Sequence, residues 1–281
     1  MPSFRGASDV ARPGRGIDRF PALDPCRLGR VIPMPNDGYL DKSVHWKVRT
    51  GQIAFAEPTH DEVADAILDA GLASAVGRRL GSGKQADVYL CREGGRLVAV
   101  KVYRQYRTAH RGGGSIKLES MGQRAVREFE LLNYAFQGGA KVPRPGERVE
   151  NMFSMQYLGS ADSPAPMLQH ADLDDPPAFL AATVAGVEGL AEAGLVHSDL
   201  SPFNILVHDG SPWFIDLAAG VRVDRLGWPP WARLTEAMAS LDNGLRSLER
   251  YFRRFDLSLD REDVRTRVRA QIDRYGVLEP S

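Results

Sequence analysis

The stretch that most restricts the fold is residues 76–103, VGRRLGSGKQADVYLCREGGRLVAVKVY. Two runs rich in β-forming residues, 86–91 and 97–103, are separated by turn residues at 93–95, and a further apolar run precedes them. The pattern predicts an antiparallel meander with a glycine-rich loop at its first bend. Lys101 lies inside the last strand, where an ammonium group is costly unless it is paired. The fold must therefore bring an acidic side chain to this lysine.

The glycine-rich loop follows the first predicted strand, around 76–80, and invites three interpretations. A Walker A loop fails, because Gln85 stands where serine or threonine must follow the lysine. A dinucleotide fingerprint matches Gly81, Gly83 and Ala86, but it must open a helix, and a strand follows here. The third interpretation is a kinase-type loop, whose backbone approaches a triphosphate and whose next strand carries a lysine. Lys101 in VAVKVY meets that requirement.

The natural counter-ion of Lys101 is Glu128, on a helix predicted over 124–138. The apolar residues that turn this helix toward the sheet recur at helical spacing: Val126, Phe129, Leu132 and Phe136. Glu130 on the same helix is the alternative partner. A lysine that is positioned by a carboxylate can place its positive charge beside the α- and β-phosphates of a nucleotide.

A second group of polar residues lies in GLVHSDLSPFNILV and the WFID segment that follows it. Phosphoryl transfer needs mainly positioning and positive charge on the phosphate oxygens. Asp199 suits the task of orienting a hydroxyl or accepting its proton, and Asn204 and Asp216 suit Mg²⁺ coordination. His197 is expected to bond to the backbone near Asp216. The spacing H-x-D-x-x-x-x-N before a strand ending in Asp is typical of kinase-like phosphotransferases.

The remaining segments are mainly helical or irregular. Residues 1–40 contain six prolines and no periodicity, which predicts a disordered arm. Thr59 is the expected N-cap of a helix, and 104–123, with three consecutive glycines, predicts a long mobile loop. After residue 176 the pattern is mainly helical. It ends in an amphipathic helix with an apolar stripe over 234–255, which packs on a lobe or, as the alternative, forms a coiled-coil face.

Composition limits the class of protein. Thirty-six basic residues balance thirty-six acidic ones, so no global charge favours nucleic acid. Two cysteines, Cys26 and Cys91, are too few for a disulfide framework and favour a reducing compartment. No apolar run approaches the roughly 18 residues of a membrane-spanning helix. We therefore expect a cytoplasmic protein without a membrane partner.

Six blocks in order, GSGKQADVY, VAVKVY, REFELL, YLGSADSPAPML, HSDLSPFNILV and FIDLAAGV, resemble the RIO-type atypical serine/threonine protein kinases over residues 60–258. The resemblance implies an α+β fold of the two-lobed protein-kinase type. A small antiparallel sheet with one αC-type helix would form the N-lobe at 76–158, and a mainly helical C-lobe would occupy 159–281, after a helical extension at 41–75. A full activation segment and the late C-lobe helices would be missing, and no Ala-Pro-Glu element follows Asp216.

The resemblance also implies ATP with Mg²⁺, or Mn²⁺, in the cleft. Asp199 would be the catalytic aspartate, acting with Lys101 and Asp216, while Asn204 and Asp216 would bind the metal. In this family Asp216 would also accept phosphate as an aspartyl-phosphate, so ATP hydrolysis competes with protein phosphorylation. The nucleotide-binding residues implied are Ser82, Gly83, Lys84, Val88, Lys101, Glu128, Met155, Gln156 and Leu158.

The chain departs from the family in several places. The loop reads GSGK where relatives usually read STGK, and Gln85 replaces a common Glu. Pro202 and Phe203 replace the Glu-Tyr that often precedes the metal-binding Asn. The loop after the lysine strand lacks the usual sequence, so Ser115 and Ser120 are only candidates for autophosphorylation.

Three functions fit these residues. The leading one is an ATP-dependent serine/threonine kinase or ATPase that acts on a protein, on itself or on water, with a ribosome-assembly particle as a partner that the family alone implies. A small-molecule phosphotransferase of the aminoglycoside or choline kinase type is the alternative, because its HGDLxxxN…ID blocks resemble residues 197–216. A nucleotide-binding scaffold without turnover is the third.

Overall fold

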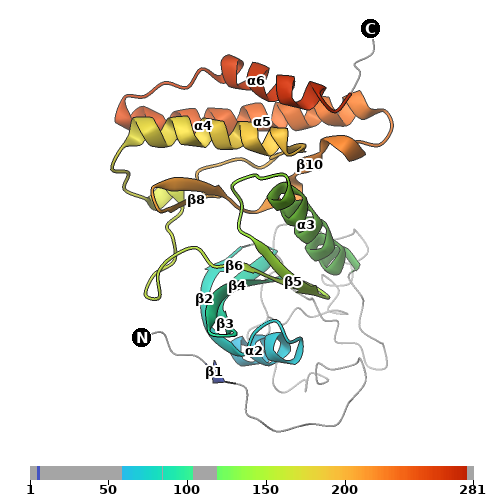
Figure 1. Cartoon of the computed structure of the whole chain (residues 1–281), viewed down its shortest axis with the longest axis vertical. Coiled ribbons are helices and arrows are strands. Elements are labelled where there is room, and N and C mark those ends of the chain that lie inside the picture. The colour runs from blue at the N-terminus through green and yellow to red at the C-terminus, as the bar shows by residue number, and fades with distance from the viewer. Residues whose placement is uncertain (1–4, 7–58, 84, 104–118, 277–281) are drawn as a thin grey trace, which may run out of the picture.

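The computed structural model describes residues 5–6, 59–83, 85–103 and 119–276, which form a sheet lobe and a helical lobe (Figure 1). Every pair of neighbouring strands in the large sheet is antiparallel, as the meander predicts. In order across the sheet, the strands are β1 (Arg5–Gly6), β2 (Ala75–Ser82), β3 (Ala86–Glu93), β4 (Arg96–Tyr103), β6 (Met152–Gln156) and β5 (Pro145–Val149). The expected strands of the meander are confirmed as β2, β3 and β4, whereas β5 and β1, which lies within the predicted disordered arm, are additions.

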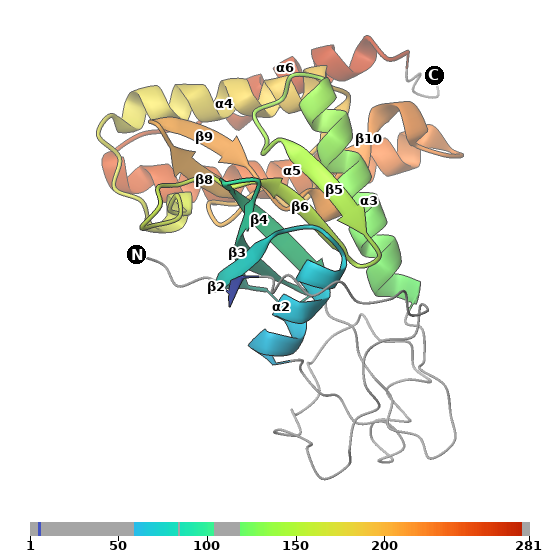
Figure 2. The same ribbon diagram turned by 60° about the horizontal axis from the view of Figure 1, so that its bottom comes forward.

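Helices α2 (His60–Asp69) and α3 (Glu119–Gln137) cover opposite faces of this sheet (Figure 2). Thr59 caps α2 in a capping box with Glu62, as its sequence predicts. Side chains alternate between the two faces of a strand. Val100 of β4 therefore joins the apolar cluster under α2, whereas the next residue, Lys101, points to α3.

Two expectations for α3 are wrong. The helix begins at Glu119, so residues 119–123 are helical and not part of a loop. Its buried face is also rotated from the expected stripe: Phe136 is 39% exposed, whereas Ala125 and Ala135 are fully buried. The small alanine side chains let the helix approach the core closely, which brings Glu128 into the middle of the buried face.

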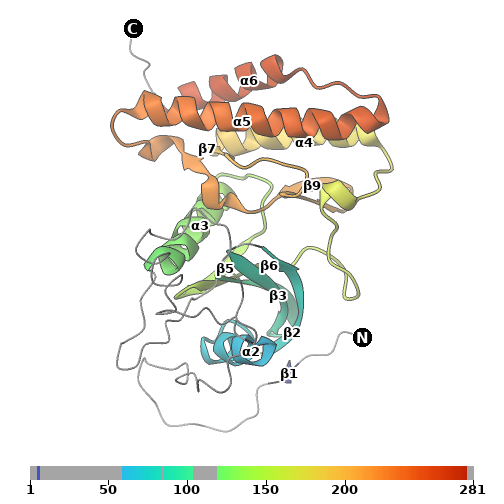
Figure 3. The same cartoon turned by 180° about the vertical axis from the view of Figure 1, so that it is seen from behind.

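The helical lobe consists of α4 (Pro176–Glu192), α5 (Pro230–Phe252) and α6 (Arg261–Asp273) (Figure 3). The stripe predicted for the last amphipathic helix is confirmed in α5, where Leu234, Leu241 and Leu248 are buried. The lobe places this stripe in its core and not on a coiled-coil face. Within the described ranges, no helix has the length and apolar character needed to cross a membrane.

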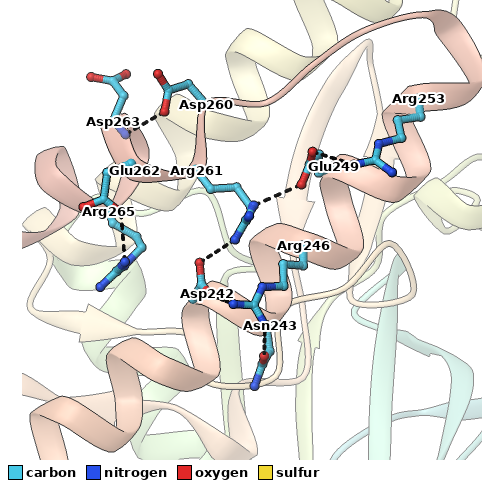
Figure 4. A network of polar contacts seen from close by, with 10 residues as sticks. All are labelled: Asp242, Asn243, Arg246, Glu249, Arg253, Asp260, Arg261, Glu262, Asp263 and Arg265. Carbon is cyan, nitrogen blue, oxygen red and sulfur yellow. Dashed lines mark hydrogen bonds and ion pairs between the residues drawn. The ribbon is translucent and has the colours of Figure 1, made fainter.

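Helix α6 was not expected from the sequence. It buries one residue per turn and is otherwise rich in arginine and acidic residues. Arg261 joins it to α5, with Nη1 2.9 Å from Asp242 Oδ1 and Nε 3.0 Å from Glu249 Oε2 (Figure 4). Ion pairs to α5 therefore supplement the narrow apolar stripe by which α6 joins the core of the lobe.

Several short elements precede or connect the long helices of the helical lobe, and some of them flank the polar residues of the site. They are β7 (Leu195–Val196) paired with β10 (Val221–Arg222), β8 (Ile205–His208) paired with β9 (Ser211–Phe214), and the 3-10 turns η2 (Leu168–His170), η3 (Leu217–Ala219), η4 (Val223–Arg225) and η5 (Arg253–Phe255). Between Asp216 and α5 lie only η3, β10, η4 and a short loop. The chain thus has the expected two-lobed kinase-like architecture without a full activation segment.

Candidate active site

Lys101 is the centre of the polar contacts between the lobes. Its Nζ lies 2.7 Å from Glu128 Oε1 and 3.2 Å from Asp216 Oδ1, and the residue is 9% exposed. Burial disfavours the ammonium form, but the negative charges of Glu128 and Asp216 outweigh it and raise the pKa of Lys101. Glu128 is thus confirmed as the partner, whereas Glu130 is exposed. The direct contact with Asp216 was not expected.

Tyr103 completes the surroundings of Glu128. Its hydroxyl donates a hydrogen bond to Glu128 Oε2, so both oxygens of this buried carboxylate are engaged. Burial, and then the negative charge of Glu128, raise the pKa of Tyr103, which keeps the hydroxyl protonated as a donor. Tyr103 was not predicted as a site residue from the sequence. The available signal was its position two residues after Lys101 in a strand, which places both side chains on one face.

Asp216 is the accessible member of the group. It follows β9, is the N-cap residue of η3 and has a left-handed backbone with φ 59° and ψ 64°. Such conformations are costly for residues other than glycine and concentrate at functional sites. Its side chain is 46% exposed while one oxygen contacts Lys101. Asp216 therefore presents a carboxylate both to the lysine and to the surface.

His197 holds two backbone segments together. Its Nε2 lies 3.1 Å from the carbonyl oxygen of Ile215, and its Nδ1 accepts from the Asp199 N–H at 3.3 Å. Burial lowers the pKa of His197, which favours the neutral ring with the proton on Nε2. The expected bond to the backbone beside Asp216 is confirmed.

Asn204 lies next to Asp199. Its Nδ2 donates to the Asp199 carbonyl at 2.7 Å and approaches Asp199 Oδ2 at 3.3 Å, while the Ile215 N–H donates to the Asn204 carbonyl at 3.0 Å. The side chain of Asp199 is exposed, so an acceptor can reach it. The loop that carries Asp199 and the segment that carries Asp216 are thus bonded together.

The oxygen donors at this site fit Mg²⁺. The amide oxygen of Asn204 and the carboxylate of Asp216 are hard ligands of the type that Mg²⁺ prefers. In the part of the chain that the structure describes, no group of three or more His, Cys, Asp or Glu side chains forms a metal cage. A pair of protein ligands is what Mg²⁺ uses when substrate phosphates and water complete its coordination.

The glycine-rich loop leaves β2 at Ser82 and Gly83, both exposed, and the Gly83 N–H donates to the Ala86 carbonyl at 2.9 Å. Lys84 lies outside the described residues, as do Ser115 and the side chain of Ser120. Gln85 accepts a hydrogen bond from Arg124 Nη1 at 2.6 Å, a contact that was not expected from the sequence. Because Arg124 lies one helical turn before Glu128, this bond ties the loop to α3.

The residues expected around an adenine base lie on β3, β6 and the segment after it. Val88, half-buried, is paired in register with Lys101, and Met155 packs between the cores of the two lobes. The Gln156 N–H already donates to Arg144 O at 2.8 Å, and the Leu158 carbonyl accepts from Ala165 at 2.9 Å. A base would therefore have to use the Gln156 carbonyl and the Leu158 N–H.

A family model for the RIO domain matches residues 87–263. The chain is 31% identical to the RIO-type serine/threonine-protein kinase Rio1 of Haloferax volcanii over 186 residues, which is 61% of this chain and 64% of that protein. It is 30% identical to the serine/threonine-protein kinase RIO1 of Caenorhabditis elegans over 163 residues, 52% of this chain and 32% of that protein. The matches thus span less than two thirds of the length of these two relatives.

Solved structures with a similar fold include the Rio2 kinase of Chaetomium thermophilum, with a TM-score of 0.56 at 21% identity, covering 85% of this chain and 82% of that one. The Rio2 kinase–ADP/Mg²⁺–phosphoaspartate complex from the same organism gives a TM-score of 0.55, again at 21% identity, with 85% and 80% covered. At this identity the similarity concerns the fold.

Proposed function

This chain belongs to the RIO kinase family, and we propose that it binds ATP with Mg²⁺ and transfers the γ-phosphoryl group to a serine or threonine hydroxyl of a protein, to itself or to water. The observation that carries the proposal is the contact of Lys101 with both Glu128 and Asp216. It joins β4, α3 and the segment after β9 around one ammonium group. A buried pair alone would stabilise the sheet lobe, whereas a third, half-exposed partner supports a role in ligand binding.

In this proposal, Lys101 holds the α- and β-phosphates. Glu128 keeps it charged and directed, and Tyr103 fixes the orientation of Glu128. Ser82 and Gly83 would contact the phosphates from the glycine-rich loop, and Lys84 is a further contact that the family resemblance alone implies. The Gln85–Arg124 bond supports a fixed position of that loop relative to α3.

Transfer to a hydroxyl uses Asp199. Its carboxylate accepts the hydroxyl proton while the oxygen bonds to the γ-phosphorus, and the bond from that phosphorus to the bridging oxygen breaks, releasing ADP. Asn204 and Asp216 would hold Mg²⁺, which supplies positive charge to the phosphate oxygens when bound. The exposure of the Asp199 side chain supports its access to an acceptor.

Asp216 is itself a second acceptor in this proposal. One carboxylate oxygen bonds to the γ-phosphorus as ADP leaves, which gives an acyl phosphate, and water then releases inorganic phosphate and restores the carboxylate. The half-exposed side chain and the lysine 3.2 Å away support this route. The Chaetomium thermophilum neighbour contains ADP, Mg²⁺ and phosphoaspartate.

The proposal also covers the lobe boundaries, the partners and the location of the protein. We place the N-lobe at 76–158 and the C-lobe at 159–281, with ATP between them. A protein substrate, a ribosome-assembly particle as partner and a cytoplasmic location remain predictions from the family resemblance.

A labelled-ATP experiment tests the proposal. The wild type with γ-labelled ATP and Mg²⁺ should label itself or an added protein, or release labelled phosphate, and Asp199→Ala and Asp216→Asn should lose the activity. Asp209→Asn is the matched control, because Asp209 is also exposed with a left-handed φ of 49° but follows β8 away from Lys101. We expect this control to retain full turnover.

Other outcomes would identify the other functions. Transfer only to an added aminoglycoside or to choline would show a small-molecule phosphotransferase. ATP binding without turnover under any of these conditions would show a scaffold, and the proposal would be wrong.

A further inference from the structure

Phe203 is an exposed aromatic residue in the loop that carries the candidate catalytic groups. It directly precedes Asn204, lies four positions after Asp199, and is 51% exposed. Single exposed apolar residues are common and need no explanation. This one differs because the groups on either side of it in the loop are those proposed for phosphoryl transfer.

Two more exposed residues with apolar surface lie on the turn η2 and at its N-cap, and one of them contacts Phe203. The ring centroid of His170 is 5.9 Å from that of Phe203 in an edge-on arrangement, and Met167 at the N-cap of the same turn is 38% exposed. The Gln169 N–H donates to the Pro202 carbonyl at 3.0 Å, which holds η2 against the loop. We name Met167, His170 and Phe203 the Phe203 platform.

The exposed charges next to this platform are mainly negative. Asp172 and Asp174 follow it along the chain and are exposed, as is Asp199 on the loop itself. The nearby cation, Arg254, is exposed; its guanidinium stacks 4.0 Å from the ring centre of Tyr251 and donates to the Ala171 carbonyl at 3.2 Å. The three exposed carboxylates outnumber this one cation. An approaching segment with lysine or arginine is therefore favoured over an acidic one.

We propose that the Phe203 platform binds the acceptor protein segment, with an apolar side chain near the phosphorylated serine or threonine resting on Phe203. Lysine or arginine residues of the same segment would face Asp172 and Asp174. The position of Phe203 beside Asp199 identifies what binds there. A serine or threonine hydroxyl that reaches Asp199 belongs to a peptide segment that must pass over Phe203. This inference rests on the proposed function and adds the acceptor class.

Peptide substrates provide the test. The probes are glycine- and alanine-based peptides with one serine and two lysines, in which each position flanking the serine is leucine, alanine or aspartate in turn. At one of these flanking positions we expect the leucine peptide to have a kcat/KM about tenfold higher than the alanine peptide. A factor of this size is what partial burial of one aliphatic side chain contributes. Exchange of the lysines for glutamate should lower the rate.

Variants separate the platform from a general loss of activity. Phe203→Ala should bring the leucine-to-alanine ratio to about one without changing KM for ATP, and Phe203→Leu should keep most of the preference. Trp228→Ala is the control, because Trp228 is 88% exposed and lies outside the platform. It should leave the ratio unchanged.

The outcomes distinguish this inference from the proposed function. A protein that turns over ATP but labels none of the peptides would overturn the inference while the proposed function stands. Equal ratios in wild type and Phe203→Ala would also overturn it, and would leave the platform as a surface for a second copy or for another segment of this chain. A protein that neither binds nor turns over ATP would refute both.

Discussion

Tyr103→Phe removes one hydroxyl from the interior of the site. The aromatic ring stays, so the packing of the surrounding core is retained, and only the hydrogen bond to Glu128 Oε2 is lost. Tyr103 is 1% exposed and Glu128 is 4% exposed, so water cannot readily replace the missing donor. The substitution therefore isolates the contribution of one bond to a buried carboxylate.

The expected loss has two parts. A hydrogen bond to a charged group contributes about 1.5–3 kcal/mol, and an unpaired buried oxygen adds to its loss, so the free energy of unfolding should fall by about 2 kcal/mol. Glu128 retains its bond to Lys101 but gains freedom to rotate. A positioning loss on the order of 1 kcal/mol at the lysine corresponds to roughly fivefold weaker ATP binding.

Urea unfolding and ATP titration measure the two parts separately. Tyr251→Phe is the matched control, because the Tyr251 hydroxyl also bonds a charged group, Arg254 Nη2, and Tyr251 is also buried, but it lies in the helical lobe. The control should lose less stability, because Arg254 is exposed and water can replace its bond, and it should keep its ATP affinity. If both variants bind ATP like the wild type, Tyr103 does not position Glu128 and the reasoning fails.

Three further predictions concern two glycines and the buried histidine. Alanine at Gly244 would place its Cβ 2.6 Å from Leu200 Cβ and 2.8 Å from Leu200 O. Gly244→Ala should therefore lower the free energy of unfolding by about 1–3 kcal/mol, and lower turnover as well. In α4, a Cβ at Gly189 would meet nothing within 4 Å, so Gly189→Ala should raise the free energy of unfolding by about 0.5–1 kcal/mol in the same urea assay. Burial lowers the pKa of His197, so below about pH 6.5 the unfolded chain binds a proton that the folded chain does not. As the pH is lowered from about 6.5 to the pKa of the folded state, the free energy of unfolding should fall by up to about 1.4 kcal/mol per pH unit. His197→Gln should show a flatter pH dependence, and identical slopes for the two proteins would contradict the assignment.

Residues with an unmet chemical requirement were predictable from the sequence. A lysine inside an apolar strand requires a counter-ion, and the following helix offered Glu128, so the pair was expected and is confirmed. A histidine near two backbone segments needs partners for its ring, and the bond of His197 to Ile215 O agrees with that expectation. In both cases the energetic cost of leaving the group unpaired narrows the choice of partner.

Contacts that depend on packing were not predictable in this way. The rotation of α3 depends on how closely Ala125 and Ala135 approach the core, and bulky residues such as Phe136 suggested a different face. The bond from Lys101 to Asp216 depends on how the two lobes meet. Helix α6 buries a narrow stripe and relies partly on Arg261, a residue type that an apolar pattern does not register.

The same distinction separates the two halves of the proposed reaction. The nucleotide half relies on buried charges such as Lys101 and Glu128, whose requirements restrict sequence and structure together. The acceptor half relies on exposed residues such as Phe203, which departs from the family pattern, whereas Pro202, which also departs from it, is buried. Exposed residues have no folding requirement that fixes their type, so their identity can follow the acceptor. For this reason, we expect substitutions at Phe203 to change which segment is phosphorylated, and substitutions at Glu128 to change whether ATP is bound.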